Sequence, residues 1–319
     1  MTTLNLLQRH PPAGQSVLQA TCRALKALVL KGLVLGTALV LAGCAAPGGT
    51  GDAARADAWQ PRLGQPGKDV MWLPTRDALL QRMLQAAQVG PQDIVYDLGA
   101  GDGKIVMAAA RDFGARAVGI EYDGRLAALA QAQVQQAGLA SRARIVQGDI
   151  FETDFSEATV LTLYLLEELN ARLRPTILAM RPGTRVVSNT FSMGDWEPDE
   201  VITVQGQTAY RWVVPARVQG RWALQGWPGE GPAELTLVQH HQRLAGQFTH
   251  QGQTQPVLGA RIDGDQVQLS VRLPDGRLQP LRLRWQANGE LSGEVVPPYG
   301  MHDVPPPPQP LQARRLAQG

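Results

Sequence analysis

The sequence predicts an α/β fold with a doubly wound parallel sheet, followed by a small antiparallel all-β domain. Two patterns carry this prediction. Over residues 69–215, short apolar runs typical of buried strands alternate with amphipathic helical segments, as in a parallel sheet covered by helices. Over residues 216–300, apolar and polar residues alternate with period two between Asp-Gly and Asn-Gly turns, as in antiparallel hairpins.

A glycine-rich turn opens the α/β domain. The apolar residues 94–95 begin a predicted strand, and the alanine-rich run 105–110 predicts a helix. Between them stand Gly99, Gly101 and Gly103. Glycines let the backbone pass close under a ligand, and the free N–H groups at the start of a helix face that ligand. The strand, glycine turn and helix together predict a nucleotide-binding unit.

Two classes of ligand use such a turn, and the spacing of the glycines separates them. A dinucleotide fingerprint needs G-x-G-x-x-G, whereas here the third glycine comes one residue early and Lys104 takes its place. An NAD-binding oxidoreductase is therefore the disfavoured alternative. Asp97, two residues before the first glycine, suits a ligand with an ammonium group better than it suits a pyrophosphate.

Acidic residues end three successive predicted strands. Asp97 ends the first strand, Glu121 follows the strand over 117–120, and Asp149 follows the strand over 143–146. An acid at the tip of the second strand, about twenty residues after the loop, is able to bind both hydroxyls of a ribose. These acids are expected to meet at one edge of the sheet, and the competing interpretation is that they are ordinary strand-end and turn residues.

Further elements complete the α/β domain. The first helix has its apolar positions at Leu79, Leu80, Met83, Leu84 and Ala87. Trp72 and Pro74 precede this helix. They are expected either to form a lid over the ligand or to pack in the core. The remaining predicted elements are a helix over 125–136, a strand over 159–164, a helix over 167–180 interrupted by Pro175, a strand over 185–189, and a closing pair over 201–204 and 210–214.

The glycine loop and several shorter segments resemble known enzymes. Asp97 and the three glycines match motif I of the class I S-adenosyl-L-methionine (SAM) methyltransferases. The shorter segments are 73–75, 162–166, 173–175, 182–188 and 191–196. Together they resemble the seven-strand protein-lysine methyltransferases of mitochondrial membrane carriers and ATP synthase subunits, and their bacterial relatives. The resemblance covers about residues 70–215 and implies a Rossmann-like methyltransferase sheet with SAM as cofactor.

The resemblance also implies which residues bind the cofactor. In that family an acid after the third strand accepts a hydrogen bond from the adenine amino group, and here that acid is Asp149. The residues expected to bind SAM are Asp97, Gly99, Gly101, Asp102, Gly103, Glu121, Asp149 and Ile150.

The end of the fourth strand is where these enzymes usually meet their substrate. Tyr164 and Glu167 are expected to be catalytic, because an amine must lose its proton before it attacks a methyl group. Glu167 and Glu168 are also typical of a helix start, where acids act as caps and dipole partners. Glu167 stands where many relatives have Pro, which affects the acceptor pocket. The segment lacks the Asn/Asp-Pro-Pro-Tyr tetrapeptide of base-methylating enzymes, so a base acceptor is disfavoured.

Histidines and net charge argue against two other kinds of site. No histidine lies between residues 11 and 239, which excludes a histidine base from the α/β domain, and no metal-ligand spacing is present, so no metal is expected. His240 and His241 are expected on the surface of a strand or turn. Without residues 1–43 the chain holds 26 basic and 28 acidic residues, so an electrostatic nucleic-acid binder is not expected either.

The first 43 residues are predicted to be a signal peptide. They hold four basic residues and no acidic one, and the apolar core over 32–41 is too short for a spanning helix. The ending Leu41-Ala42-Gly43-Cys44 resembles a bacterial lipobox, which implies that Cys44 is lipidated; an uncleaved anchor and a plain signal peptide are the alternatives. Residues 44–68, rich in Gly, Ala and Pro, are predicted to be a flexible linker.

The all-β domain carries no chemistry that the sequence reveals. About eight short strands over residues 216–300 predict a small barrel or sandwich, and residues 301–319 are predicted to be a proline-rich tail. This domain is expected to bind a partner or glycan, or to cover the sheet.

Taken with these resemblances, the sequence implies a SAM-dependent methyltransferase that acts on an amine, a protein lysine, and is lipid-anchored at the periplasmic face of the cell envelope. The outer membrane is favoured over the inner one, because Ala45 rather than an aspartate follows Cys44. The alternative is a non-enzymatic envelope lipoprotein that keeps the SAM-binding fold as a binding module. SAM is made in the cytosol, which favours this alternative, whereas the complete set of acids and glycines favours the enzyme.

Overall fold

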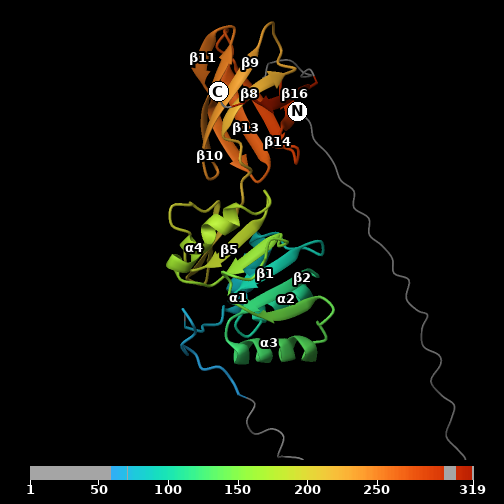
Figure 1. Ribbon diagram of the computed structural model, residues 1–319, viewed down its shortest axis with the longest axis vertical. Coiled ribbons are helices and arrows are strands. Elements are labelled where there is room, and N and C mark those ends of the chain that lie inside the picture. Colours follow the sequence, from blue (N-terminus) through green and yellow to red (C-terminus); the bar gives the residue numbers. More distant parts are fainter. Residues whose placement is uncertain (1–58, 70, 298–306, 318–319) are drawn as a thin grey trace, which may run out of the picture. The chain divides into compact units, whose positions relative to one another are not determined.

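The computed structural model describes residues 59–69, 71–297 and 307–317 (Figure 1). The predicted signal peptide, Cys44 and the first part of the predicted linker lie outside these residues. Within them, no helix is long and apolar enough to cross a membrane.

A seven-stranded sheet forms the α/β domain, with its strands in the order β3-β2-β1-β4-β5-β7-β6. Strands β1 to β5 are parallel, and β7 runs antiparallel to both of its neighbours. The strands are β1 (Ile94–Leu98), β2 (Arg116–Glu121), β3 (Ala143–Gln147), β4 (Val160–Leu163), β5 (Arg185–Asn189), β6 (Glu200–Val204) and β7 (Gln207–Val213). The helices are α1 (Asp77–Ala86), α2 (Lys104–Asp112), α3 (Gly124–Gln136) and α4 (Glu167–Leu178).

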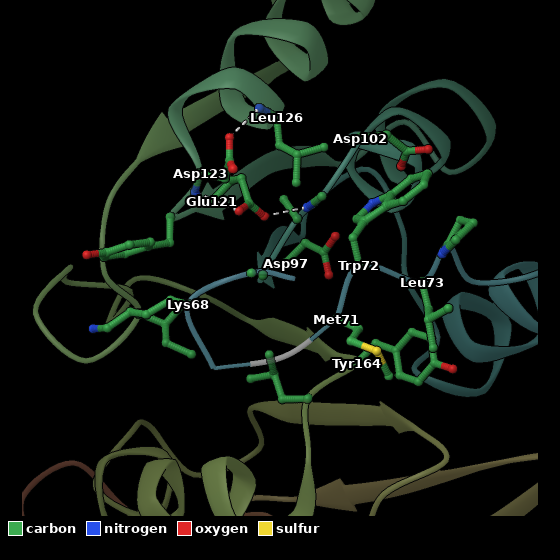
Figure 2. Close-up of a pocket in the computed structure, with 18 of the residues that line it drawn as sticks. Lys68, Met71, Trp72, Leu73, Asp97, Asp102, Glu121, Asp123, Leu126 and Tyr164 are labelled. Atoms are coloured by element: carbon green, nitrogen blue, oxygen red, sulfur yellow. Dashed lines mark hydrogen bonds between the residues drawn. The ribbon is translucent and has the colours of Figure 1, made fainter. Parts of the chain in front are cut away.

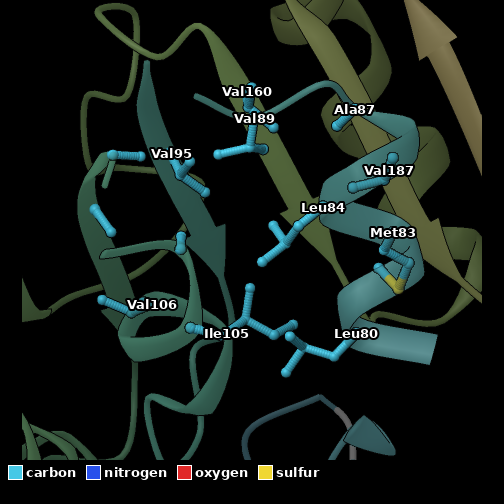
Figure 3. Close-up of a cluster of buried hydrophobic side chains, with 14 of the residues drawn as sticks. Leu80, Met83, Leu84, Ala87, Val89, Val95, Ile105, Val106, Val160 and Val187 are labelled. Carbon is cyan, nitrogen blue, oxygen red and sulfur yellow. The ribbon is translucent and has the colours of Figure 1, made fainter. Parts of the chain in front are cut away.

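Helices cover both faces of this sheet, as a doubly wound fold requires. On one face α1 and α2 pack on the strands; their apolar side chains, such as Leu84 and Ile105, meet Val95 and Val187 in one buried cluster (Figure 3). On the other face, α4 contributes Leu173 to a second buried cluster. The alternation of side chains along each strand produces this division, since successive residues point to opposite faces.

Two local features of the α/β domain relate directly to the predictions. The predicted interruption at Pro175 is wrong, because α4 continues through this residue as one helix. Pro175 is on the exposed side of α4, whereas the buried Leu173 and Ile177 hold the helix against the sheet. Proline has no backbone N–H, so one helix carbonyl lacks its usual donor, and on the exposed side water is able to donate to it. The closing pair β6–β7 turns at Gln205 and Gly206, which have φ of 50° and 75°, the signs of a tight hairpin turn.

The all-β domain is a closed barrel rather than a sandwich. Its strands are β8 (Gly220–Gln225), β9 (Ala233–His240), β10 (Arg243–His250), β11 (Gln253–Pro256), β12 (Leu258–Asp263), β13 (Gln266–Arg272), β14 (Leu278–Trp285), β15 (Leu291–Val295) and β16 (Gln309–Arg315). Eight of them form an antiparallel ring, which β9 closes by pairing with both β8 and β10, while β11 pairs with β10. The inward-facing side chains fill the barrel, and Trp222 is fully buried among them.

Part of the predicted proline-rich tail is a strand of the barrel. Residues 309–315 form β16, which pairs with β15 on one side and with β8 on the other. Leu311 and Ala313 are buried two residues apart, the spacing of one face of a strand. The prolines dominate the composition of this region, and the two buried apolar positions are too few to show a period of two in the sequence.

Candidate functional site

A pocket opens at the carboxyl ends of the central strands of the sheet. It lies where β1 is flanked by β2 and β4, the point at which the strand order reverses and ligands of α/β folds usually bind. Residues from the glycine loop, from the ends of β1, β2 and β4 and from segment 65–75 line it (Figure 2). The predicted SAM-binding residues in its wall are Asp97, Gly99, Gly101, Asp102, Glu121, Asp149 and Ile150.

The three loop glycines have left-handed backbone conformations and crowded surroundings. Their φ angles are 86°, 55° and 76° for Gly99, Gly101 and Gly103, where other residues are strained. A Cβ on Gly103 would lie 3.0 Å from the Cβ of Ala130, so this glycine permits α2 and α3 to pack closely. A Cβ on Gly101 would lie 2.7 Å from the indole nitrogen of Trp72, so this glycine permits a second segment to cross the loop.

Asp97 is a buried carboxylate on the floor of the pocket. Its side chain is 3% exposed and accepts a hydrogen bond of 2.6 Å from the hydroxyl of Thr162. Burial raises the pKa of Asp97 most; together with the carboxylates of Asp102 and Glu121, and against the hydrogen bond from Thr162, it brings that pKa from 3.8 to about 7. A cation placed beside Asp97 would therefore be bound strongly, since it relieves both burial and repulsion.

Glu121 holds the glycine loop as well as lining the pocket. One carboxylate oxygen accepts from the backbone N–H of Gly101 and the other from that of Asp123, both at 2.8 Å (Figure 2). Burial raises the pKa of Glu121. Each carboxylate oxygen has a further lone pair, so the side chain is able to accept from ribose hydroxyls while it orders the loop.

Asp149 is paired with a lysine that the sequence did not single out. Lys68 Nζ lies 2.6 Å from Asp149 Oδ2 and 4.7 Å from the centre of the Tyr122 ring. The other oxygen of Asp149 accepts from the backbone N–H of Phe151 at 2.9 Å. The hydrogen bond from Lys68 holds the pKa of Asp149 below its usual range. The residue expected to bind adenine thus already has a partner on the protein.

Lys68 belongs to a strap, residues 59–69 and 71–75, that crosses the pocket. Gly64 and Trp72 are joined by a hydrogen bond of 3.0 Å, and Trp72 donates back to Gln65 at 2.9 Å. The end of the predicted flexible linker is therefore folded against the site. Lys104 anchors the strap, since its amine lies 2.6 Å from Asp77 and 3.3 Å from the carbonyl of Thr75. Of the two positions that the sequence allowed for Trp72, a lid and core packing, the structure favours the lid, since Trp72 lines the pocket beside Gly101.

The two predicted catalytic residues have different positions. Tyr164 lies in the pocket wall, with its ring 6.4 Å from that of Phe191 at the end of β5. Glu167 is exposed, is absent from the lining of the pocket among the described residues, and accepts from the hydroxyl of Ser192 at 2.6 Å. The structure therefore favours the alternative role for Glu167, an acid in the first turn of α4.

Three contributors to the site escaped the sequence analysis. They are Thr162, which holds Asp97, and Lys68 and Tyr122, which lie together at the mouth of the pocket. Thr162 begins segment 162–166 of the family resemblance, but nothing in its apolar strand marks it as a partner of Asp97. Lys68 is 81 residues from its partner Asp149, so no local spacing links them.

The chemistry of the pocket fits SAM. The buried Asp97 suits a cationic ammonium group, Glu121 has free lone pairs for hydroxyls, and Asp149 suits an amino group. The loop at Gly101 leaves no room for a Cβ, as expected where a ligand and its covering segment lie close to the backbone.

Comparison with known proteins supports the same cofactor. The family model of the ANTKMT methyltransferase domain matches residues 97–200. A protein-lysine N-methyltransferase of Saccharolobus islandicus is 44% identical over 151 residues, which are 46% of this chain and 94% of that protein. The adenine nucleotide translocase lysine N-methyltransferase of Mus musculus is 30% identical over 34% of this chain, which spans 48% of the mouse protein.

Among solved structures, an RNA methyltransferase from Salinibacter ruber in complex with S-adenosyl-L-homocysteine is 48% identical. The match covers 46% of this chain and 96% of that one, with a TM-score of 0.45. A SAM-dependent methyltransferase from Geobacter sulfurreducens, also in complex with S-adenosyl-L-homocysteine, is 24% identical over 36% of this chain and 48% of its own, with a TM-score of 0.33.

Proposed function

Since the chain belongs to the family of protein-lysine N-methyltransferases and is a SAM-dependent methyltransferase, we propose that it methylates the side-chain amine of a protein lysine. The Saccharolobus islandicus relative, which the chain spans almost completely, is a protein-lysine N-methyltransferase. The observation that carries the proposal is the buried carboxylate of Asp97 between the glycine loop and the wall that contains Tyr164. A cationic ligand beside this carboxylate relieves the burial and the repulsion that raise its pKa to about 7.

Residues of the pocket divide between the cofactor and the acceptor. When bound, SAM supplies a methyl group on a sulfonium, which an amine attacks directly. Asp97 binds the ammonium group, and Glu121 orders the loop and binds the ribose. Asp149, once free of Lys68, binds the adenine amino group. None of these side chains needs to change its place in the fold.

The acceptor enters on the side of Tyr164. The ring of Tyr164 and that of Phe191 lie 6.4 Å apart, and they form an apolar wall for the stem of a lysine. The phenol oxygen is able to accept a hydrogen bond from the amine and to orient it. An amine in apolar surroundings loses its proton more readily than one in water, which leaves its lone pair free to attack. Positioning of this kind supplies roughly 7–11 kcal/mol of a barrier.

Transfer of a radioactive methyl group identifies the acceptor class. The full chain is incubated with methyl-labelled SAM and with separate protein and RNA fractions of its source, and labelled protein is hydrolysed to amino acids. We expect label in protein as methyl-lysine. Label in RNA alone would overturn the lysine acceptor without affecting SAM binding, which calorimetry with SAM, S-adenosylhomocysteine and NAD measures independently.

A lipid anchor at Cys44 is the second part of the proposal. The Leu41-Ala42-Gly43-Cys44 sequence after a basic, apolar leader supports processing as a lipoprotein of the cell envelope, with the outer membrane favoured. Cys44→Ser is expected to abolish labelling by a palmitate analogue and retention in membranes. A variant that still fractionates with membranes after its leader is cleaved would contradict the anchor.

A further inference from the structure

A second group of chemically reactive side chains lies outside the cofactor pocket. It consists of Asp195, in the turn that follows β5, and of His240 and His241, at the end of β9 and in the turn to β10. One ligand atom from each residue lies within 4.8 Å of the other two. All three residues belong to the same compact unit of the chain.

Two distances within this group are slightly longer than those between ligands around a zinc ion. Asp195 Oδ2 lies 3.7 Å from Nε2 of His240 and 3.6 Å from Nε2 of His241. Both distances are too long for hydrogen bonds. Nitrogen and oxygen ligands at 2.0–2.1 Å from a tetrahedral zinc ion lie about 3.4 Å from each other, so a small closure of the group would complete such a site.

His241 has an unsatisfied nitrogen that points to a missing ligand. Its Nε2 atom is buried and has no hydrogen-bond partner among the described residues. An unsatisfied buried polar atom destabilises the folded protein, and a bound cation would remove that cost.

Arg174 fixes the carboxylate of the group without blocking it. Its guanidinium pairs with Oδ1 of Asp195 and donates to the carbonyl of Met193 at 2.7 Å. The other oxygen, Oδ2, is the one that faces the two histidines. A carboxylate that is hydrogen-bonded through one oxygen and ligates through the other is the usual arrangement around a protein-bound metal.

We propose that Asp195, His240 and His241 bind a divalent transition-metal cation, with zinc as the best fit. Two imidazoles and one carboxylate suit zinc, and the partly exposed Asp195 and His240 leave a fourth position for water. The metal joins the turn between β9 and β10 to the loop after β5. That loop also carries Phe191, beside Tyr164 in the acceptor wall, so the metal stabilises the acceptor side of the enzyme.

Zinc binding to the full chain tests the site, with calorimetry in a buffer that does not chelate metals. The Cys22→Ser/Cys44→Ser double variant serves as the background, because cysteines outside the described residues also bind zinc. We expect one zinc ion per chain, a zinc-dependent rise in melting temperature, and, with cobalt, the absorption bands of a tetrahedral ion. His240→Ala changes a largely exposed side chain and is expected to remove all three effects.

His250→Ala is the matched control, because it removes another imidazole of the barrel, one that contacts the carbonyl of Glu230. This variant is expected to bind zinc as the background does. Background protein that binds no zinc, or zinc binding that His240→Ala and His250→Ala reduce equally, would overturn the site. Either result leaves SAM binding and lysine methylation untouched.

Discussion

Asp97 and Glu121 each have two roles in the pocket. Each is placed to bind a ligand, and each also changes the stability of the cofactor-free protein. Asp97 is held by Thr162 but faces two other acids, and burial raises its pKa to about 7. Glu121 binds two backbone N–H groups of the loop region. Burial also raises the pKa of Glu121, but the two hydrogen bonds that it accepts hold the loop. We therefore expect loss of these hydrogen bonds to destabilise the cofactor-free protein, and Asp97→Asn, which removes a buried charge, to stabilise it.

Asp97→Asn is expected to abolish SAM binding and to stabilise the cofactor-free protein above pH 7. An acid whose pKa is raised by folding, here from 3.8, loses stability as the pH rises from about 4 to about 7. The amide does not titrate and still accepts from Thr162. The difference in unfolding free energy should grow from near zero at pH 4 to at most about 4 kcal/mol at pH 8.

Urea denaturation at several pH values measures this difference, and calorimetry at pH 8 measures SAM binding. Thr162→Val is the control, since it removes the hydrogen bond to Asp97 but keeps the carboxylate. A variant Asp97→Asn that is less stable than wild type at pH 8 would show that the ionised carboxylate stabilises the loop.

Glu121→Ala should weaken SAM binding at least tenfold and also destabilise the cofactor-free protein. The change leaves the N–H groups of Gly101 and Asp123 without their acceptor, at about 1–3 kcal/mol for each group that stays buried. Glu121→Gln keeps one acceptor oxygen, so it should lose less stability while still losing affinity. Thermal denaturation and calorimetry separate the two effects; equal melting temperatures for wild type and Glu121→Ala would refute the loop-ordering role.

At the scale of elements, the strap is what distinguishes this pocket from a bare glycine loop. It places Trp72 above Gly101 and Lys68 on Asp149, and Lys104 ties it to the start of α1. The ion pair is exposed, so its contribution to stability is small. Its position matters more, since Lys68 occupies the carboxylate that we propose for the adenine amino group. On that proposal, the strap competes with the cofactor at one end and covers it at the other.

Lys68→Ala is expected to raise SAM affinity by about two- to fivefold, the effect of removing one exposed ion pair that competes with the ligand. The effect should shrink at high salt, because salt screens exposed pairs. Arg62→Ala is the matched control, as it removes a positive charge from the same strap without touching Asp149. Calorimetric titration at low and high salt is the measurement. A loss of affinity in Lys68→Ala would mean that Lys68 contacts the bound cofactor instead.

At the scale of the whole molecule, the two sheets differ in whether their edge strands are paired. The α/β sheet ends at β6, which pairs with β7 alone, whereas the described ring of the barrel is closed because β9 pairs with both β8 and β10. The ring depends on β16, which joins β15 to β8. The last strand along the chain thus completes the core of the second domain.

Leu311→Ala is expected to destabilise the barrel by about 2–5 kcal/mol, since Leu311 is buried inside it and its loss leaves a cavity. Gln312→Ala, one residue on and exposed, should change stability by less than about 0.5 kcal/mol. Urea unfolding followed by tryptophan fluorescence measures both variants, because the buried tryptophans include Trp222 in the core of the barrel as well as Trp196 and Trp212 of the α/β domain. Similar curves for both variants would show that β16 lies outside the cooperative unit.

Local pattern determined much of this protein. Each strand of the parallel sheet is a short apolar run, so the places of Asp97, Glu121 and Asp149 at the strand ends followed from the sequence alone. The glycine loop followed in the same way, because its backbone conformations require glycine at fixed positions. The resemblance to methyltransferases then implied the cofactor, which comparison with known proteins supports.

Tertiary structure alone decided the rest. Glu167 lies outside the pocket wall because α4 directs it to the hydroxyl of Ser192. Strand β16 belongs to the barrel because Leu311 and Ala313 are buried in its core. The pairing of Lys68 with Asp149, and the meeting of Asp195 with two histidines of the barrel, join segments far apart in the chain. Periodicity records only which face of an element is apolar. Which distant side chains meet depends on how whole elements pack, and no local spacing encodes that.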